Sequence, residues 1–139
     1  MHLALQTDYA LRVLLYLMER PGRATVAEVA AFHAISAHHV GKVVNQLGRL
    51  GLIHNQRGPG GGIELARAAG SITVGAVIRA FERTTRMLQC VDTPDICVIQ
   101  PGCGLRQALA EAERRQMDYL DGVAIESLVT RHQTLVTIS

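Results

Sequence analysis

The three cysteines of this 139-residue chain lie on one short stretch in its second half. They are Cys90, Cys97 and Cys103, separated by six and then by five residues, and two prolines and two glycines interrupt the stretch up to Gly104. Such a composition favours a loop over a continuous helix or strand. Three thiols on one loop can point inward together, and soft thiolate ligands select zinc, copper(I) or iron–sulfur clusters. The stretch therefore predicts an inorganic centre held by sulfur.

The residues alone leave other interpretations of these cysteines open. Free cysteines can be small buried hydrophobic residues, although three on one loop rich in proline and glycine argue against that here. A structural zinc site needs a fourth Cys or His at the spacing of a closed site, and the loop holds none, so that His2 or another distant residue would have to reach it. A redox switch built on bare thiols, without metal, is a further alternative.

The composition is that of one small globular domain, with or without an appended dimerisation element. Hydrophobic residues make up 48% of the chain and tryptophan is absent, so the core must consist mainly of Leu, Val, Ile and Ala. The apolar run over 9–18 contains Arg12, is spaced as in a helix and is too short to cross a bilayer. No secretory signal is recognisable, so we expect a cytoplasmic protein whose cysteines stay reduced.

The net charge of +2 is too small to identify a nucleic-acid-binding protein, and only its distribution is informative. Residues 1–70 carry seven Lys/Arg against four Asp/Glu, whereas residues 71–139 carry seven against eight. Five of the six histidines also lie in the first half. This excess of basic residues in the N-terminal half is compatible with a DNA-binding unit there.

Local signals predict two helices in the first third of the chain. Thr7 is a good N-cap and Asp8 suits the positive end of a helix dipole, so we expect the first helix to open there and to end before Pro21. The pattern from Thr25 to Glu28 is a capping box, which predicts a second, short helix over 26–32.

A third helix completes a helix-turn-helix. Ser36 caps it, Gly51 ends it, and five apolar side chains are directed inward along it. Two helices joined by a short turn, the second of them polar on its outer face, indicate a helix-turn-helix. N-terminal residues of a recognition helix reach base edges, although an ordinary solvated face is the alternative. The predicted DNA contacts of this helix are Ser36, His38, His39 and Lys42.

Two strands, over 52–57 and 62–65, are predicted to follow directly and to form a hairpin. A hairpin directly after a helix-turn-helix makes a winged helix. The tip of this wing is nearly devoid of side chains and is headed by Arg57, so it can enter a minor groove, where an arginine meets strong negative potential. The predicted DNA contacts of the wing are Arg57, Gly58, Pro59 and Gly60.

Two more helices flank the cysteine loop. Thr73 caps a predicted helix over 74–83, and a long helix begins at Gly104 and is interrupted at Gly122. The apolar stripe of this long helix is predicted to leave most charged side chains, Glu113 among them, outside. The stripe consists of Leu105, Ala108, Leu109, Ala112, Gln116 and Leu120. Such a helix generally needs a partner, and a second copy of the chain is the simplest one.

The predicted fold is mainly α: a winged helix-turn-helix with a two-stranded wing and a long C-terminal dimerisation helix. We expect a DNA-binding domain over 1–83, a cysteine-rich cluster-binding loop over 84–104, and a dimerisation helix with a C-terminal tail over 105–139. The residues do not support an enzyme. No Ser/His/Asp set or paired carboxylates are recognisable, and the glycine run of the wing lacks the Lys-Ser/Thr and following helix of a phosphate-binding loop.

Three features together resemble the bacterial winged-helix iron–sulfur transcriptional regulators of the IscR/NsrR family. They are the sequence from Thr7 to Arg12, the wing from Arg57 to Gly62, and three cysteines just before a long helix. The resemblance covers roughly residues 1–130. It implies a homodimer, a recognition helix in the major groove, and an iron–sulfur cluster, 4Fe–4S by similarity, held by the three cysteines.

Within this family the chain is more similar to the NsrR-like, nitric-oxide-sensing repressors. IscR-like members place a histidine ligand three residues after the last cysteine, where this chain has Arg106, which cannot bind iron because it is always protonated. The resemblance implies that Asp8 ligates the cluster of the partner subunit. An ion pair with Arg12 is the simpler role for Asp8, and Asp92 and Asp95 on the loop are competing oxygen donors.

The sequence thus predicts a homodimeric transcriptional repressor that binds a palindromic operator and releases it when nitric oxide nitrosylates its cluster. A regulator of the IscR type that responds to cluster supply or redox status is one alternative. A DNA-binding regulator built on zinc or bare thiols is the other.

Overall fold

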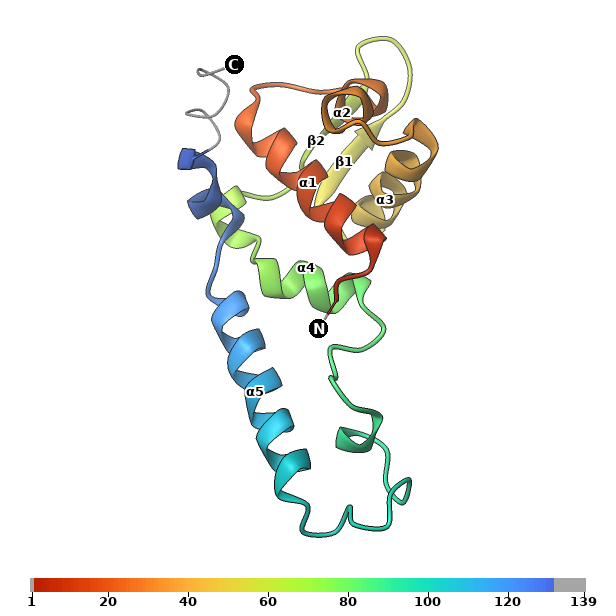
Figure 1. Ribbon diagram of the computed structural model, residues 1–139. Helices are drawn as coiled ribbons and strands as arrows, with labels where there is room; N and C mark the ends of the chain where they lie inside the picture. The colour runs from red at the N-terminus through yellow and green to blue at the C-terminus, as the bar shows by residue number, and fades with distance from the viewer. Residues whose placement is uncertain (1, 132–139) are drawn as a thin grey trace.

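Helices α1 (Leu5–Glu19), α2 (Val26–His33) and α3 (Ala37–Arg49) pack around one hydrophobic core in the computed structural model, which describes residues 2–131 (Figure 1). The side chains at the centre of this core are completely or almost completely buried because the apolar positions of each helix recur on one face. They include Ala10, Val13, Leu14, Val29, Val40, Val43, Val44 and Leu47.

The caps predicted for α2 and α3 are confirmed. Oγ1 of Thr25 accepts a hydrogen bond from the backbone N–H of Glu28 at 3.1 Å, while Oε2 of Glu28 accepts one from the N–H of Thr25 at 3.0 Å. Oγ of Ser36 accepts the N–H of His39 at 3.2 Å. Gly51, at φ +73°, follows the last residues of α3 in the left-handed conformation that glycine adopts without cost.

The predicted cap of α1 at Thr7 is wrong. The N-cap is Ala4, three residues earlier, and Thr7 lies inside the helix with a fully buried side chain. Its hydroxyl donates to Oε1 of Glu82 at 2.6 Å, and the backbone N–H of Ala4 donates to the same oxygen at 2.7 Å. A distant carboxylate therefore lies at the positive end of α1, where it accepts a backbone N–H and the Thr7 hydroxyl.

Strands β1 (Ile53–Gln56) and β2 (Gly62–Leu65) form the antiparallel wing, with Ile53 opposite Leu65 and Gln56 opposite Gly62. The first strand is shorter at both ends than the predicted 52–57. The backbone of Ala24, between α1 and α2, pairs with Ile63 through two hydrogen bonds of 3.0 and 2.7 Å and so anchors the hairpin to the helices. The winged helix-turn-helix predicted from the sequence is confirmed.

The winged helix-turn-helix formed by α1–α3 and the two strands is called the head. Helix α4 (Val74–Phe81) lies beneath this head, and helix α5 (Gly104–Asp121) projects away from it (Figure 1). The predicted cap at Thr73 is present, but α4 ends at Phe81, short of the predicted residue 83. After α5 the chain returns to the head through a 3₁₀ segment (Ile125–Arg131), in which Ile125 is fully buried. The tail over 132–139 lies outside the described residues. Within residues 2–131 every helix is too short or too polar to cross a membrane.

The buried face of α5 differs from the predicted one. Its two buried residues are Glu113, 2% exposed, and Met117, 4% exposed, although Glu113 was expected to lie outside. Of the predicted stripe, Leu109, Gln116 and Leu120 are half-buried, and Leu105, Ala108 and Ala112 are exposed. Glu113 turns inward because it meets hydrogen-bond donors on the segment after α4, a tertiary partner that hydrophobic spacing along the helix does not encode.

At Gly75, α4 and the end of α5 are in close contact. A Cβ there would lie 2.7 Å from the backbone nitrogen of Asp121 and 2.9 Å from its Cα, so the two helices would have to separate. We expect Gly75→Ala to lower the free energy of unfolding by about 1–3 kcal/mol in thermal or urea unfolding. Gly41→Ala in α3, where nothing lies within 4 Å, is the control and should stabilise by about 0.5–1 kcal/mol. Equal effects of the two substitutions would contradict the close approach.

Candidate functional site: the cysteine loop and the DNA-facing surface

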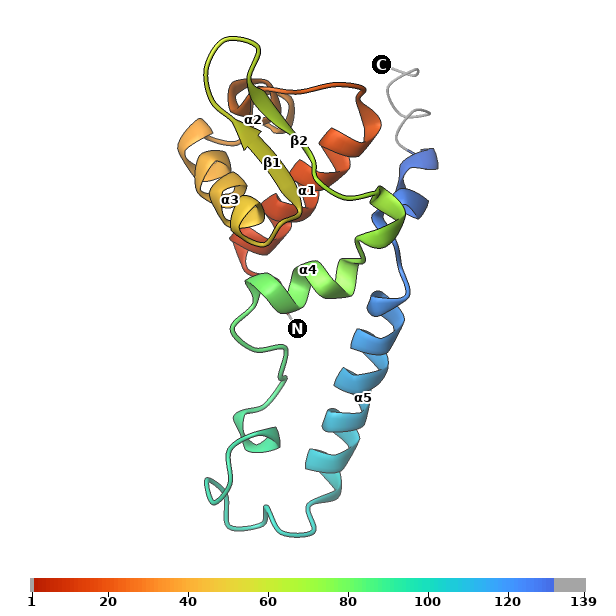
Figure 2. The same cartoon turned by 180° about the vertical axis from the view of Figure 1, so that it is seen from behind.

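The cysteine loop (residues 84–103) leaves the end of α4, runs beside α5 and turns back at its far end to begin that helix (Figures 1 and 2). Its one regular element is a 3₁₀ turn (Gln89–Val91) that packs against α5. The predicted loop is therefore confirmed as irregular structure. All three thiols are free: Cys90 and Cys103 are partly buried, and Cys97 is exposed.

Gln100 holds the interior of the cysteine loop together. Its side chain is nearly buried, with the residue 6% exposed, and both ends of the amide are used. The Nε2 group donates to the carbonyls of Cys90 at 2.9 Å and Thr93 at 2.6 Å, while Oε1 accepts the N–H of Ile96 at 3.0 Å. The sequence analysis missed this residue, because a glutamine in a loop carries no signal of its tertiary partners.

Arg106, in the first turn of α5, reaches back to the start of the loop. Its Nε donates to the carbonyl of Cys90 at 2.6 Å and its Nη2 to that of Val91 at 3.2 Å. The sequence indicated only that this arginine cannot be a metal ligand. The structure shows what the side chain does instead: it fixes the backbone that carries the first cysteine.

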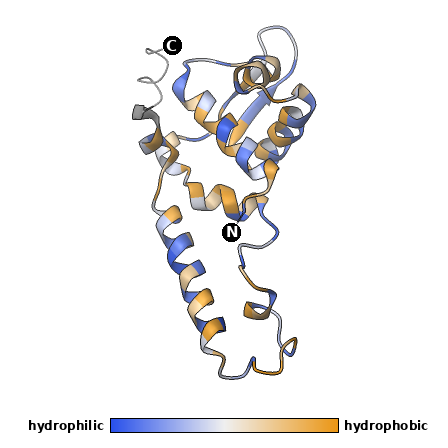
Figure 3. Ribbon diagram, in the orientation of Figure 1, coloured by the Kyte–Doolittle hydropathy of each residue, from blue (hydrophilic) through white to orange (hydrophobic). Residues whose placement is uncertain are grey.

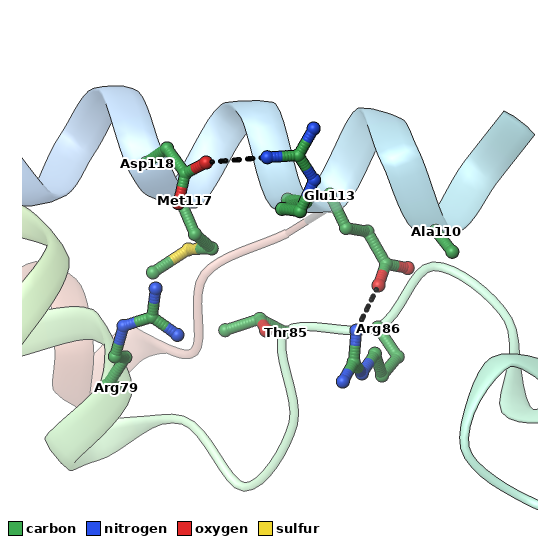
Figure 4. A pocket seen from close by; sticks show the side chains of 8 residues that line it. Arg79, Thr85, Arg86, Ala110, Glu113, Met117 and Asp118 are labelled. Carbon is green, nitrogen blue, oxygen red and sulfur yellow. Dashed lines mark hydrogen bonds and ion pairs between the residues drawn. The ribbon is translucent and has the colours of Figure 1, made fainter.

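A buried carboxylate joins α5 to the same loop (Figure 4). The carboxylate of Glu113 accepts a hydrogen bond from the backbone N–H of Met87 and forms an ion pair with Nη1 of Arg86 at 3.3 Å. Nε of the same arginine donates to the carboxylate of Asp92 at 2.7 Å. These bonds, to Asp92 first and to Glu113 second, raise the pKa of Arg86 above its ordinary value. The group borders a cavity of about 400 Å³ between α4, α5 and the start of the loop. The loop is therefore held by polar side chains and not by its thiols.

The chemistry of the three donors fits an iron–sulfur cluster, since three thiols on one loop are the ligands that such clusters prefer. The geometry is incomplete in the single chain. Across residues 2–131 no three His, Cys, Asp or Glu side chains are gathered closely enough to hold a metal ion. Cys90, Cys97 and Cys103 would thus hold the group only after the loop draws them together, with a fourth ligand from elsewhere.

The candidate oxygen ligands are differently placed. Asp8 lies in the first turn of α1 and pairs with Arg12 at 3.1 Å, with both side chains well exposed. Asp92 is engaged by Arg86, and Asp95 stands at a tight turn of the loop with φ +58°. Within one chain, then, Asp8 makes the simple helical ion pair.

The predicted DNA-contacting side chains of α3 point away from the core. His38, His39 and Lys42 are exposed, and Ser36 both caps the helix and stays accessible. The ring of His39 lies 6.3 Å from that of Tyr9, and a hollow between the starts of α1 and α3 is lined by both rings and Lys42. The turn of α1 that carries Asp8 is therefore next to the residues expected to read DNA.

The wing tip is exposed and built almost wholly of backbone. Gly58 and Gly60 adopt φ of +94° and +74°, a conformation that favours glycine. Arg57 is exposed and shares with Arg49 of α3 a polar groove of about 560 Å³ between α3 and β1. Nη1 of Arg23 donates to the carbonyl of Gly60 at 2.9 Å and steadies the tip. Arg23 and Arg49 were missed, because neither lies in the motif that marks the wing.

Comparisons with known proteins agree with this architecture. The model of the Rrf2 family, described as an iron-dependent transcriptional regulator, matches residues 3–131. The HTH-type transcriptional regulator NsrR of Bacillus subtilis strain 168 is 37% identical over 141 residues, covering 99% of this chain and 97% of that protein. NsrR of Geobacillus kaustophilus strain HTA426 is 38% identical, covering 97% of this chain and 94% of that protein.

Solved structures share the fold at lower identity. CymR of B. subtilis, named as a global cysteine regulator, superimposes with a TM-score of 0.78 at 22% identity, covering 94% of this chain and 97% of that one. IscR of T. potens superimposes with a TM-score of 0.73 at 19% identity, covering 93% of this chain and 86% of that one. These matches place the winged helix, the loop and the projecting helix in one common architecture.

Proposed function

The chain belongs to the Rrf2 family of transcriptional regulators, and from this premise we propose that it is a homodimeric repressor that senses nitric oxide through a 4Fe–4S cluster. It would bind a palindromic operator in the cytoplasm and release it on exposure to nitric oxide. The observation that carries the proposal is the loop itself: three free thiols on a segment that other side chains hold in place. Regulation of transcription, and not catalysis, is the role that the family supports.

The ligands proposed for the cluster are Cys90, Cys97 and Cys103 from one chain and Asp8 from the partner subunit. A bound cluster would supply iron that reacts with nitric oxide. A carboxylate is a harder ligand than a thiolate and a poorer match for such iron, so the position held by Asp8 would be the most exchangeable one. Because Asp8 lies in the first turn of α1, the signal would enter the DNA-binding head directly.

The surface of the cysteine loop supports dimer formation. Val98 is 98% exposed and Ile99 67% exposed, and Leu105 at the start of α5 is 63% exposed. Figure 3 shows hydrophobic residues along the same loop and the adjoining part of α5. Exposed apolar residues gathered on one segment are typical of an interface, and a second copy of the chain would cover them and bring the partner's α1 near the loop.

Two contacts connect the start of the cysteine loop with the surface proposed to bind DNA. Glu82, just before the loop, accepts the hydroxyl of Thr7, and Tyr9 contacts His39 on α3. A displacement of the first turn of α1 would therefore also displace the side chains at the start of the recognition helix α3. Since two heads must fit half-sites about one helical turn apart, a small change in their separation costs several contacts at once. Direct contacts are proposed for Ser36, His38, His39, Lys42, Arg57, Gly58, Pro59 and Gly60.

The proposal is tested by purifying the protein under strict exclusion of oxygen and titrating it with nitric oxide. Cluster absorbance and binding to a duplex selected from a random pool by the untreated protein are followed together. We expect both signals to fall in parallel. Duplex binding that is indifferent to the gas would refute nitric-oxide sensing, and a colourless protein that still binds the duplex would indicate zinc or bare thiols.

Asp8→Asn separates the two roles of that side chain. The exposed ion pair with Arg12 is worth little, so the free energy of unfolding should change by about 0.5 kcal/mol or less. Cluster retention should fall about tenfold or more, and the nitric-oxide titration should shift. Arg12→Gln breaks the same ion pair and leaves the carboxylate, so it is the matched control. If both variants respond like the wild type, Asp8 serves only α1.

A further inference from the structure

The backbone carbonyl of Cys90 receives two side-chain hydrogen bonds, one from the later part of the loop and one from the first turn of α5. Nε2 of Gln100 donates to it at 2.9 Å, and Nε of Arg106 donates to it at 2.6 Å. Hydrogen bonds from a charged donor are about twice as strong as those between neutral groups. The backbone at the first cysteine of the loop is therefore firmly held.

Arg106 also connects the first cysteine with the helix start that carries the last one. It follows Cys103 by three residues and belongs to the same helical beginning, so its side chain ties the Cys90 backbone to the helix start that carries Cys103. The second bond, from Nη2 to the carbonyl of Val91, uses another arm of the same rigid guanidinium. The orientation of the 3₁₀ turn at Cys90 is thereby fixed as well as its position.

These bonds need no metal, because every donor and acceptor in them belongs to the chain. Gln100 satisfies the carbonyls of Cys90 and Thr93 and the N–H of Ile96 from a nearly buried position. The hydrogen bonds of Gln100 and Arg106 therefore keep the loop backbone ordered when no metal is bound. Partners of this kind beyond the ligands typically govern metal affinity by a factor of about 10–100.

We propose that Arg106 is a positioning residue that, with Gln100, fixes the loop backbone around Cys90 before the metal arrives. The inference rests on the proposed function, in which this loop takes an iron–sulfur cluster. Arg106 binds no iron itself and acts through the backbone of Cys90 and Val91. Part of the loop backbone is then already ordered when the three cysteines are drawn together around the group.

The test compares Arg106→Leu with Arg115→Leu in the metal-free, reduced protein. Arg115 lies on the same helix, is 78% exposed and pairs only with Glu111 on that helix among the described residues, so it matches the loss of charge and of a long side chain. Amide hydrogen exchange over residues 89–103 should accelerate about tenfold or more in Arg106→Leu alone, with unchanged exchange in α1–α3 as the check on folding. Affinity for Co²⁺, read from thiolate-to-cobalt absorption, should fall about 10- to 100-fold.

Arg106→Lys distinguishes positioning from charge. Lysine keeps the charge but lacks the rigid fork that binds two carbonyls, so its exchange rate and Co²⁺ affinity should lie between those of the wild type and Arg106→Leu. Full recovery by lysine, or an Arg106→Leu variant that behaves like Arg115→Leu, overturns the proposal. If the wild type never takes up an iron–sulfur cluster but these differences appear, the proposed function fails while the positioning role stands.

Discussion

Replacing Cys90, Cys97 and Cys103 together by serine is expected to abolish cluster uptake and the response to nitric oxide, while the head stays folded. Serine hydroxyls are poor ligands for cluster iron, which prefers thiolates. None of the three residues is fully buried, and the loop backbone is held by Gln100 and Arg106. The free energy of unfolding of the metal-free protein should therefore change by about 0.5 kcal/mol or less.

Iron and sulfide content after anaerobic reconstitution measures the first effect, and duplex binding with and without nitric oxide measures the second. Thr93→Ser, a conservative change at an exposed position of the same loop, is the control and should behave like the wild type. A triple variant that still binds its operator and still releases it on exposure to the gas would remove the basis for the sensing mechanism. A triple variant that fails to fold would contradict the view that the loop is held by its polar side chains.

The elements that the sequence predicted correctly are those whose signals lie within a few residues of one another. The capping box from Thr25 to Glu28, the cap at Ser36 and the glycines of the wing all act over one turn or less. Local geometry decides these features, so a pattern of residue types is enough to find them. The winged helix-turn-helix followed from them.

The elements that the sequence did not reveal depend on partners far along the chain. Thr7 meets Glu82 across 75 residues, and the acceptor of Met87 N–H is Glu113, 26 residues away. Arg106 reaches back 16 residues to Cys90. From local sequence alone, a threonine near a helix start is predicted to be an N-cap, and a charged residue on an amphipathic helix is predicted to be exposed. Only the tertiary contacts show that both predictions are wrong here. The cysteines marked the site, but their support was not visible.

Arg57→Ala is expected to weaken operator binding while cluster content stays normal. Arg57 is exposed beside a tip of glycines, and with Arg49 it borders the groove between α3 and β1. Loss of one such arginine contact costs about 1–3 kcal/mol, or roughly 5- to 150-fold in affinity. Arg57 lines the groove between α3 and β1, away from the cysteine loop and from the turn that carries Asp8, so iron uptake should not respond. Fluorescence anisotropy at several salt concentrations measures the loss.

Two comparisons show what kind of contact Arg57 makes. Arg115→Ala removes an exposed arginine from α5 and should bind DNA like the wild type, since that helix is outside the reading surface. Arg57→Lys restores a phosphate contact but fits a narrow minor groove less well. Full affinity with lysine would show that the wing contacts only the phosphate backbone of the DNA. Partial affinity would show that the wing tip enters the minor groove. Equal affinities of Arg57→Ala and the wild type would show that the wing does not contact the duplex, and α3 alone would then have to provide recognition.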